Sequence, residues 1–249
     1  MDKLPIGVDI NDLIDHLRIL SWKASDILVY YSKLLEKKEN IINFLQNANN
    51  EDPVTLADLK VNEMIIHEIN EKYKNINWEI LSEENVKLIS KTTKQKTDWL
   101  WVLDPLDGTR DFIQGTANYG MHLALNFKNK PYLGIVLIPE KEELWISDGK
   151  KTWCEKKDGI RFTPNFSKNK SLKDMVLVTS KNHRNDNLRN LILKIDFKKV
   201  IIMGSIGCKI ASILRGESDI YICMSLPNMS SPKDWDFAAP EAILKNSGG

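Results

Sequence analysis

Two aspartates, Asp104 and Asp107, follow an apolar run over residues 99–103 that predicts a buried strand. Pro105 fixes one backbone angle and Gly108 permits a left-handed one, so the chain is expected to bend where the carboxylates lie. Two acids in such a place repel each other unless a cation lies between them. Mg²⁺ is the natural candidate, because it takes oxygen ligands and is usually held by a few carboxylates and substrate phosphate. A plain surface turn is the alternative explanation for either dipeptide alone.

The first half of the chain predicts helices and strands that would hold these acids in place. Apolar residues recur at helical spacing between residues 13 and 35, and a second helix is expected over residues 56–73. A short strand is expected ahead of the two acids, over residues 78–81. The alternating patterns after them predict an antiparallel series of strands over residues 119–127, 132–138 and 143–147 and a hairpin over residues 154–162.

Strands and helices alternate in the second half of the chain. Strands are expected over residues 175–179, 200–203 and 219–224, with helices between them and a last helix that begins near residue 233. The fold class is therefore predicted as α+β. We expect an N-terminal part over residues 1–165, with the antiparallel sheet and the metal site, and a C-terminal α/β part over residues 166–249, with substrate-binding segments.

The composition favours a cytoplasmic protein that acts on a small molecule. Lysine plus arginine (35) nearly balance aspartate plus glutamate (34) among 249 residues, so no overall field attracts nucleic acid or a membrane. The longest apolar run, residues 132–138, is too short to span a bilayer, and the N-terminal residues do not resemble a signal peptide. Cys154, Cys208 and Cys223 lack metal-type spacing, which indicates reduced thiols.

Several other polar residues have ordinary structural explanations when they are considered singly. The pair Glu83-Glu84 follows the strand expected over residues 78–81, where adjacent glutamates are usually solvated charge. Thr55 and Asp58 have the form of a helix capping box. Asp236 indicates an N-cap for the last helix, and His122 lies within an expected strand, where packing is its simplest role.

Taken together, these elements resemble a known superfamily. The string Asp104-Pro-Leu-Asp-Gly-Thr109 resembles the signature of the lithium-sensitive, magnesium-dependent phosphatases, which include inositol monophosphatase, fructose-1,6-bisphosphatase and 3'(2'),5'-bisphosphate nucleotidase. Three further elements match in the same order: Glu83-Glu84, Gly204 to Lys209, and Trp235-Asp236. The resemblance implies a layered α/β/α/β/α sandwich of the inositol monophosphatase or sugar phosphatase type. Members of the family generally continue past the Gly248-Gly249 pair, so the C-terminal part is expected to be short.

The resemblance also implies two or three Mg²⁺ ions and a set of ligands. Glu83, Asp104 and the backbone carbonyl of Leu106 would hold one ion, and Asp104, Asp107 and Asp236 would hold another. Glu84 is a weaker candidate ligand. Hydrolysis would then use water, without a covalent intermediate. The implied catalytic residues are Glu83, Asp58 and Thr109, of which Thr109 would orient the attacking water when paired with Asp58. Asp58 would also lie beside the ligands or hold a third ion.

Details favour the bisphosphate nucleotidase (CysQ-like) branch, which removes the 3'-phosphate of 3'-phosphoadenosine 5'-phosphate in sulfur assimilation. Arg110-Asp111 and the stretch from Ser180 to His183 are similar to elements of that branch. Lys209, His183 and backbone donors near Gly204 and Ser205 would hold the phosphate that is not cleaved. The alternative makes Lys209 a solvated helix residue and His183 a cap. The full implied set of substrate-binding residues is Asp107, Gly108, Thr109, Ser180, His183, Gly204, Ser205, Lys209 and Asp236.

Other functions stay open on the sequence. An inositol-1-monophosphatase or sugar-phosphate phosphatase of the same superfamily is the nearest alternative. A non-catalytic protein that binds metal or nucleotide is the alternative from another class, although all the expected acids are present. A small-molecule partner, and a monomer or homodimer, are expected.

Overall fold

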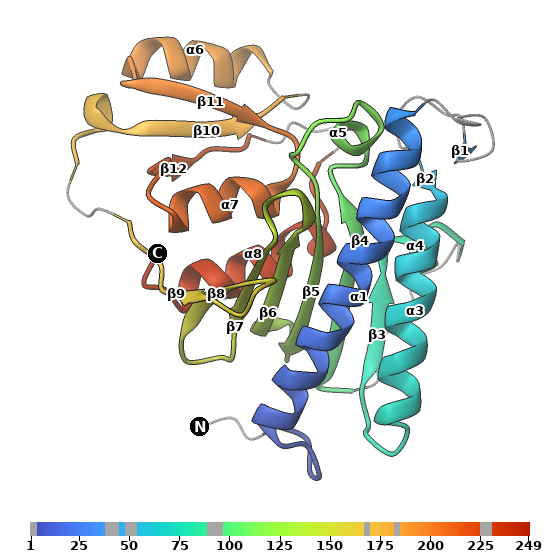
Figure 1. Ribbon diagram of the computed structural model, residues 1–249. Helices are drawn as coiled ribbons and strands as arrows, with labels where there is room; N and C mark the ends of the chain where they lie inside the picture. The colour runs from blue at the N-terminus through green and yellow to red at the C-terminus, as the bar shows by residue number, and fades with distance from the viewer. Residues whose placement is uncertain are drawn as a thin grey trace.

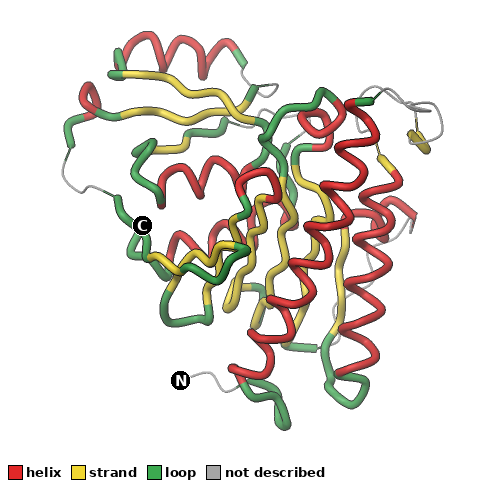
Figure 2. The backbone as a smooth tube through the Cα atoms, viewed as in Figure 1, coloured by secondary structure: helices red, strands yellow, loops and turns green. Residues whose placement is uncertain are grey.

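The computed structural model describes residues 4–37, 45–47, 54–88, 97–166, 170–181, 185–224 and 231–249 (Figure 1). Two sheets alternate with layers of helices, and Figure 2 shows helices on both sides of the larger sheet. The order of layers is α1 and α3, the larger sheet, α7 and α8, the smaller sheet, and α6. The predicted α+β class and the layered α/β/α/β/α arrangement are confirmed.

The larger sheet has the strand order β3-β4-β5-β6-β7-β8-β9, in which β3 and β4 are parallel and all other neighbours are antiparallel. The antiparallel series therefore follows the prediction, because short turns between alternating segments favour neighbouring strands. The strands are β3 (Glu79–Ser82), β4 (Trp99–Asp107), β5 (Gly120–Phe127), β6 (Lys130–Ile138), β7 (Glu143–Ser147), β8 (Thr152–Lys156) and β9 (Arg161–Phe162).

Helices α1 (Ile10–Glu36) and α3 (Leu56–Lys72) cover one face of the larger sheet. Asp9 caps α1, and the predicted capping box of Thr55 and Asp58 begins α3. On the apolar stripe of α1, Leu13, Leu17 and Leu28 are fully buried in the core shared with the sheet. Among the helices that the structure describes, none combines the length and apolar character needed to cross a bilayer.

Helices α7 (Ile206–Leu214) and α8 (Asp234–Lys245) cover the other face and form a second core. Beyond them lies a parallel sheet, in the order β11-β10-β12, and α6 (Asp186–Ile195) covers its outer face. Its strands are β10 (Val176–Ser180), β11 (Lys199–Met203) and β12 (Ile220–Tyr221). The strand predicted over residues 219–224 is thus shorter than expected.

Short elements complete the described chain: β1 (Leu45–Asn47), β2 (Val54–Thr55), α4 (Glu83–Leu88), α5 (Thr109–Ile113) and the 3₁₀ turns η1 (Pro139–Lys141) and η2 (Leu172–Asp174). The larger sheet lies wholly before residue 165 and the smaller sheet wholly after it. However, α8 comes from the C-terminal part and packs on β4, β5 and β6. The division at residues 165 and 166 stays a prediction.

Candidate active site

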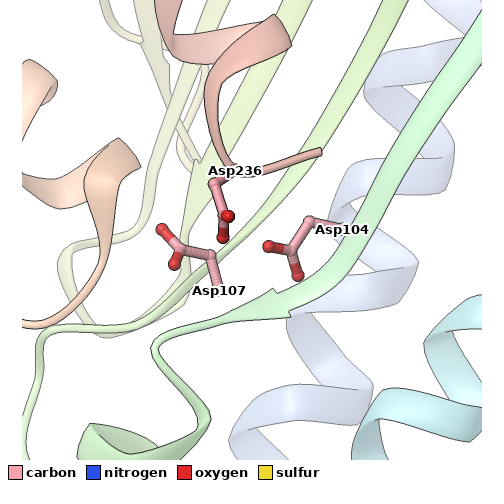
Figure 3. Close-up of side chains that lie close together, drawn as sticks. All are labelled: Asp104, Asp107 and Asp236. Atoms are coloured by element: carbon pink, nitrogen blue, oxygen red, sulfur yellow. The ribbon is translucent and has the colours of Figure 1, made fainter. Parts of the chain in front are cut away.

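Three aspartates meet where β4 ends and α8 begins (Figure 3). Asp104, Asp107 and Asp236 each bring one carboxylate oxygen to within 4.8 Å of the others. Asp104 and Asp107 are buried and Asp236 is half-buried. We call these three residues the acidic cluster. Asp104 and Asp107 come from one strand, whereas Asp236 arrives from a helix about 130 residues later in the chain.

A bulge in β4 brings the first two acids together. The strand was expected to end at residue 103, but it continues through Asp107, and the pairing with β5 shifts between Asp104 and Asp107. Asp104 pairs with His122 and Asp107 with Gly120, so one extra residue lies on β4. Residues three apart in a regular strand point to opposite faces, and the extra residue lets both carboxylates reach one site. The expected bend is therefore a bulge within the strand, at Pro105, which has no backbone N–H for the ladder.

The N-terminus of α7 holds one oxygen of Asp107. Ser205 Oγ donates to Asp107 Oδ2 at 2.7 Å, and the backbone N–H groups of Ile206 and Gly207 lie 2.5 and 3.3 Å from the same oxygen. A helix N-terminus favours a negative charge in this position. The Ser205 backbone N–H donates to Asn118 O. The donors that were expected to hold a second phosphate near Ser205 are thus engaged within the protein.

Asp236 lies in the first turn of α8, but not at the predicted position. Lys233 is the N-cap residue, and Asp236 is the third residue of the helix. Its carboxylate accepts the backbone N–H of Lys233, which is the reciprocal half of a capping box. The N-cap prediction for Asp236 is therefore wrong by three positions, because the helix begins at Asp234. Asp236 still satisfies one backbone donor at the N-terminus of α8, the N–H of Lys233.

The electrostatics of the acidic cluster favour a bound cation. Burial raises the pKa of Asp104 well above its usual range, and the charges of Glu83, Asp107 and Asp236 raise it further. Burial and then Asp107 raise the pKa of Asp236 to about 7. Carboxylates at close quarters are costly when ionised unless a positive charge compensates them. The all-oxygen donor set fits Mg²⁺, which prefers carboxylates.

Three further predicted residues lie beside this cluster. Asp58 is buried, and its Oδ2 accepts from Thr55 Oγ1 and the Thr55 backbone N–H at 2.5 and 2.9 Å. Burial raises the pKa of Asp58 to about 7, against these hydrogen bonds. Thr109 Oγ1 donates to Leu106 O at 3.0 Å and lies 3.5 Å from Asp58 Oδ1. Glu83 begins α4, and its charge raises the pKa of both Asp58 and Asp104. The structure thus brings Glu83, Asp58, Thr109 and the Leu106 carbonyl to one neighbourhood.

Lys209 is buried rather than solvated. Its side chain is almost fully buried in α7, where Nζ donates to Gly204 O at 2.6 Å and lies 5.2 Å from the centre of the Tyr221 ring. Burial lowers the pKa of Lys209, and the charges of Asp107 and Asp236 partly offset this. The alternative that made Lys209 a solvated helix residue is therefore wrong. Whether Lys209 contacts a substrate stays a prediction.

The remaining predicted residues differ in how far the structure describes them. Gly108 has a positive φ of 89° as the residue before α5, and a side chain there would also meet Asn118 O. Gly204 packs against Asp111, so that a methyl group at Gly204 would overlap its carboxylate. Ser180 is buried at the end of β10. His183 lies outside the described residues.

Two residues near the site received no active-site role from the sequence. His122, on β5, is fully buried as predicted, but its Nε2 also lies 3.2 Å from Asp107 Oδ2. Burial lowers the pKa of His122. Asp111 is buried in α5 and accepts from Thr116 Oγ1 at 2.5 Å. An ionisable residue inside an apolar strand was the available signal for His122. No local signal tied Asp111 to Gly204, which lies 93 residues later.

The model of the inositol monophosphatase family matches residues 12–249. A 3'(2'),5'-bisphosphate nucleotidase CysQ of Buchnera aphidicola is 31% identical over 149 residues, which are 60% of this chain and only 53% of that relative. A fructose-1,6-bisphosphatase/inositol-1-monophosphatase of Thermotoga maritima is 27% identical over 252 residues, covering all of this chain and 84% of that protein.

A solved structure of a Thermotoga maritima IMPase resembles the fold with a TM-score of 0.70 and 24% identity. The match covers 96% of this chain and 84% of that one. At this identity the likeness concerns the fold alone, and it agrees with the order of layers described above.

Proposed function

Because the chain belongs to the inositol monophosphatase family, we propose that it is a Mg²⁺-dependent phosphatase whose substrate is 3'-phosphoadenosine 5'-phosphate. The products would be AMP and inorganic phosphate. The observation that carries the hydrolytic part is the acidic cluster, in which three carboxylates meet and the pKa values of Asp104 and Asp236 are raised by burial and by neighbouring carboxylates. A purely structural role would leave their mutual repulsion uncompensated.

The residues that would hold Mg²⁺ are Asp104, Asp107 and Asp236, with Glu83 and the Leu106 carbonyl beside them. When bound, Mg²⁺ would polarise the phosphate and supply a reactive water at neutral pH. The protein groups have separate tasks. Asp58 is well placed to accept a proton at Oδ1, since its Oδ2 is occupied by the hydrogen bonds from Thr55.

Thr109 would orient the attacking water. Its Oγ1 lies between Asp58 Oδ1 and Leu106 O, at 3.5 and 3.0 Å, so a small rotation of the hydroxyl selects one acceptor or the other. Gly108 would let a phosphate approach the backbone at the start of α5, since it carries no side chain; a Cβ there would also meet Asn118 O. These roles require no nucleophilic side chain, and hydrolysis would proceed in one displacement.

The nucleotide part of the proposal is supported by Lys209 and by the CysQ relative. A substrate with two phosphates needs positive charge beyond the metal ions. Lys209 is a buried cation near Asp107 and Asp236, and it could leave Gly204 O to pair with a substrate phosphate. Ser180 and His183 would complete that side. The relative from Thermotoga maritima, which matches along the whole chain, supports an inositol or sugar phosphate as the second candidate substrate.

The test is phosphate release with Mg²⁺ from 3'-phosphoadenosine 5'-phosphate, inositol 1-phosphate and fructose 1,6-bisphosphate, each with and without millimolar lithium. We expect lithium-sensitive turnover with the highest kcat/KM for the adenine nucleotide. A preference for inositol 1-phosphate would favour the second candidate and leave Lys209 without its proposed task. Binding of Mg²⁺ without turnover on any substrate would favour a non-catalytic role.

A further inference from the structure

We infer that His122 is a positioning residue for Asp107. The N-terminus of α7 holds the Asp107 carboxylate on one side, and His122, which projects from the sheet, restrains it on the other. The inference rests on the proposed metal site. His122 lies on β5, directly opposite Asp104 in the β4–β5 ladder, so these two side chains share a face of the sheet. The imidazole is fully buried, and its Nε2 is 3.2 Å from Asp107 Oδ2.

The first turn of α7 packs directly on this imidazole. A methyl group at Gly207 would overlap His122 Nε2, and it would also come within 2.7 Å of Val136 Cγ1, from the neighbouring strand β6. Only a residue without a side chain lets the helix approach the sheet this closely. His122 therefore sets the separation between α7 and β5 at the point where Asp107 meets the helix.

The surroundings of Asp107 Oδ2 explain why this separation matters. The oxygen has Ser205 Oγ, two backbone N–H groups of α7 and His122 Nε2 around it at 2.5–3.3 Å. These four groups approach Oδ2 from two elements, so they restrict rotation of the carboxylate. The other oxygen, Oδ1, is then the one that can turn toward a cation held with Asp104 and Asp236.

Packing alone explains a histidine poorly at this position. Apart from Asp104, its neighbours on the same face include Ala124 and Val136, which are apolar and fully buried. Within the described chain neither ring nitrogen of His122 has a hydrogen bond of regular geometry, although backbone groups of Trp235 and Asp236 lie near the ring and counter the lowering of its pKa by burial. Burying a polar ring costs free energy that a hydrocarbon side chain of similar size would avoid. Packing requires only the shape of the ring, so the contact of Nε2 with Asp107 is the feature that distinguishes histidine at this position.

The test compares His122→Gln with His122→Met. The two replacements have similar length and volume, but only glutamine keeps an N–H donor near the place of Nε2. Binding of Mn²⁺, used as a probe for the Mg²⁺ site, would be followed by electron paramagnetic resonance without substrate. We expect H122M to weaken Mn²⁺ binding about tenfold, as is typical when a group that orients a ligand is lost. H122Q should stay within about threefold of the wild type.

Activity then separates positioning from general damage. The loss in H122M should appear as a higher Mg²⁺ concentration for half-maximal rate, with kcat largely restored at saturating Mg²⁺. Asn126→Leu is the matched control, because Asn126 is a buried polar residue on the same strand and face but has no contact with Asp107. Its Mn²⁺ affinity should equal that of the wild type. If H122M does not fold, H122N replaces it, because the asparagine amide is too short to reach Asp107.

Three outcomes would overturn the inference. Wild-type Mn²⁺ affinity in a folded H122M would remove the positioning role and leave the proposed function intact. Equal weakening in H122M and H122Q would assign His122 to packing. Absence of Mn²⁺ binding by the wild-type protein would overturn the metal site itself, and the positioning role with it.

Discussion

The larger sheet carries buried carboxylates in two regions that are neutralised in different ways. Glu143 on β7 lies 2.6 Å from Arg215 Nη1 and 3.2 Å from Lys156 Nζ. Glu155 on β8 lies 2.5 Å from Arg18 Nη2 and 2.7 Å from Arg161 Nε. In the acidic cluster, by contrast, the strongest charged neighbours of Asp104 are other carboxylates.

The difference shows which buried acids belong to the scaffold. An arginine and a lysine neutralise Glu143, and two arginines neutralise Glu155. One of these, Arg18, thereby links α1 to β8. The acidic cluster contains its charge without that compensation, which the protein tolerates only if protons or a cation take the place of arginine. Buried carboxylates therefore stabilise the fold around Glu143 and Glu155, whereas those of the acidic cluster favour binding of a cation.

The largest expected effect comes from removing charge in the acidic cluster. Asp107→Asn should lower kcat/KM by on the order of 10³-fold, at the upper end of what one preorganised electrostatic group contributes. The fold should persist, because an amide can still accept from Ser205 Oγ and Ile206 N. Phosphate release and circular dichroism on the same sample test this, and near wild-type turnover would contradict the metal assignment.

The converse change is Glu155→Gln, in the scaffold region. We expect a loss of about 2 kcal/mol in the free energy of unfolding, because Arg18 and Arg161 lose a charged partner but keep access to water. Metal affinity and kcat should stay at wild-type values. Denaturant unfolding measures the loss in the free energy of unfolding. A change in metal affinity without a change in stability would contradict the assignment of Glu155 to the scaffold.

The pH dependence of stability should differ between the wild type and Asp104→Asn without metal. Folded Asp236 holds its proton up to about pH 7, whereas an unfolded aspartate loses it near pH 4. The folded state therefore loses stability through this group as pH rises across that window. Burial lowers the pKa of His122, so this residue makes the folded state more stable as the pH rises toward about 6.5. Both proteins contain His122, so the difference between them removes its contribution.

D104N removes the Asp104 carboxyl, whose own pKa is raised well above its usual range by burial and by the charges of Glu83, Asp107 and Asp236. We therefore expect D104N to lose less stability than the wild type as the pH rises above about 4, by about 2 kcal/mol at neutral pH. Excess Mg²⁺ should reverse the order, because it binds the folded wild type and stabilises it by mass action. Thermal unfolding across pH, with and without Mg²⁺, measures both effects. Parallel curves for the two proteins would indicate that the cluster carries no excess charge.

The smallest expected effect concerns Lys209, a buried basic residue near Asp107 and Asp236, as the arginines are near Glu143 and Glu155. Lys209→Met keeps most of the buried stem and removes the charge. We expect KM for 3'-phosphoadenosine 5'-phosphate to rise about tenfold more than KM for inositol 1-phosphate, as for loss of one charge-assisted hydrogen bond. Equal changes for both substrates would make Lys209 a scaffold residue that holds Gly204 O.

Local sequence patterns predicted the elements well because each depends on neighbouring residues. Three examples are the apolar spacing of α1, the capping box at Thr55 and the alternation in β5 to β7. In each of them, the pattern relates residues that are only two to four positions apart in the sequence. The family signature from Asp104 to Thr109 is local too, and it led to the phosphatase prediction. The predicted N-cap of α8 was wrong, because the helix begins after Lys233, whose side chain is not one of those that favour the N-cap position.

The sequence by itself determined the fold class, the family and the identity of the acids. The tertiary structure decided which groups meet those acids, because these contacts join distant segments. Asp107 and the first turn of α7 are about a hundred residues apart, and no periodicity connects them. Whether Lys209 and His122 are buried depends on how α7 packs on the sheet. Burial in turn sets the pKa values and the cost of each charge, so the electrostatics of the site exist only once the layers are assembled.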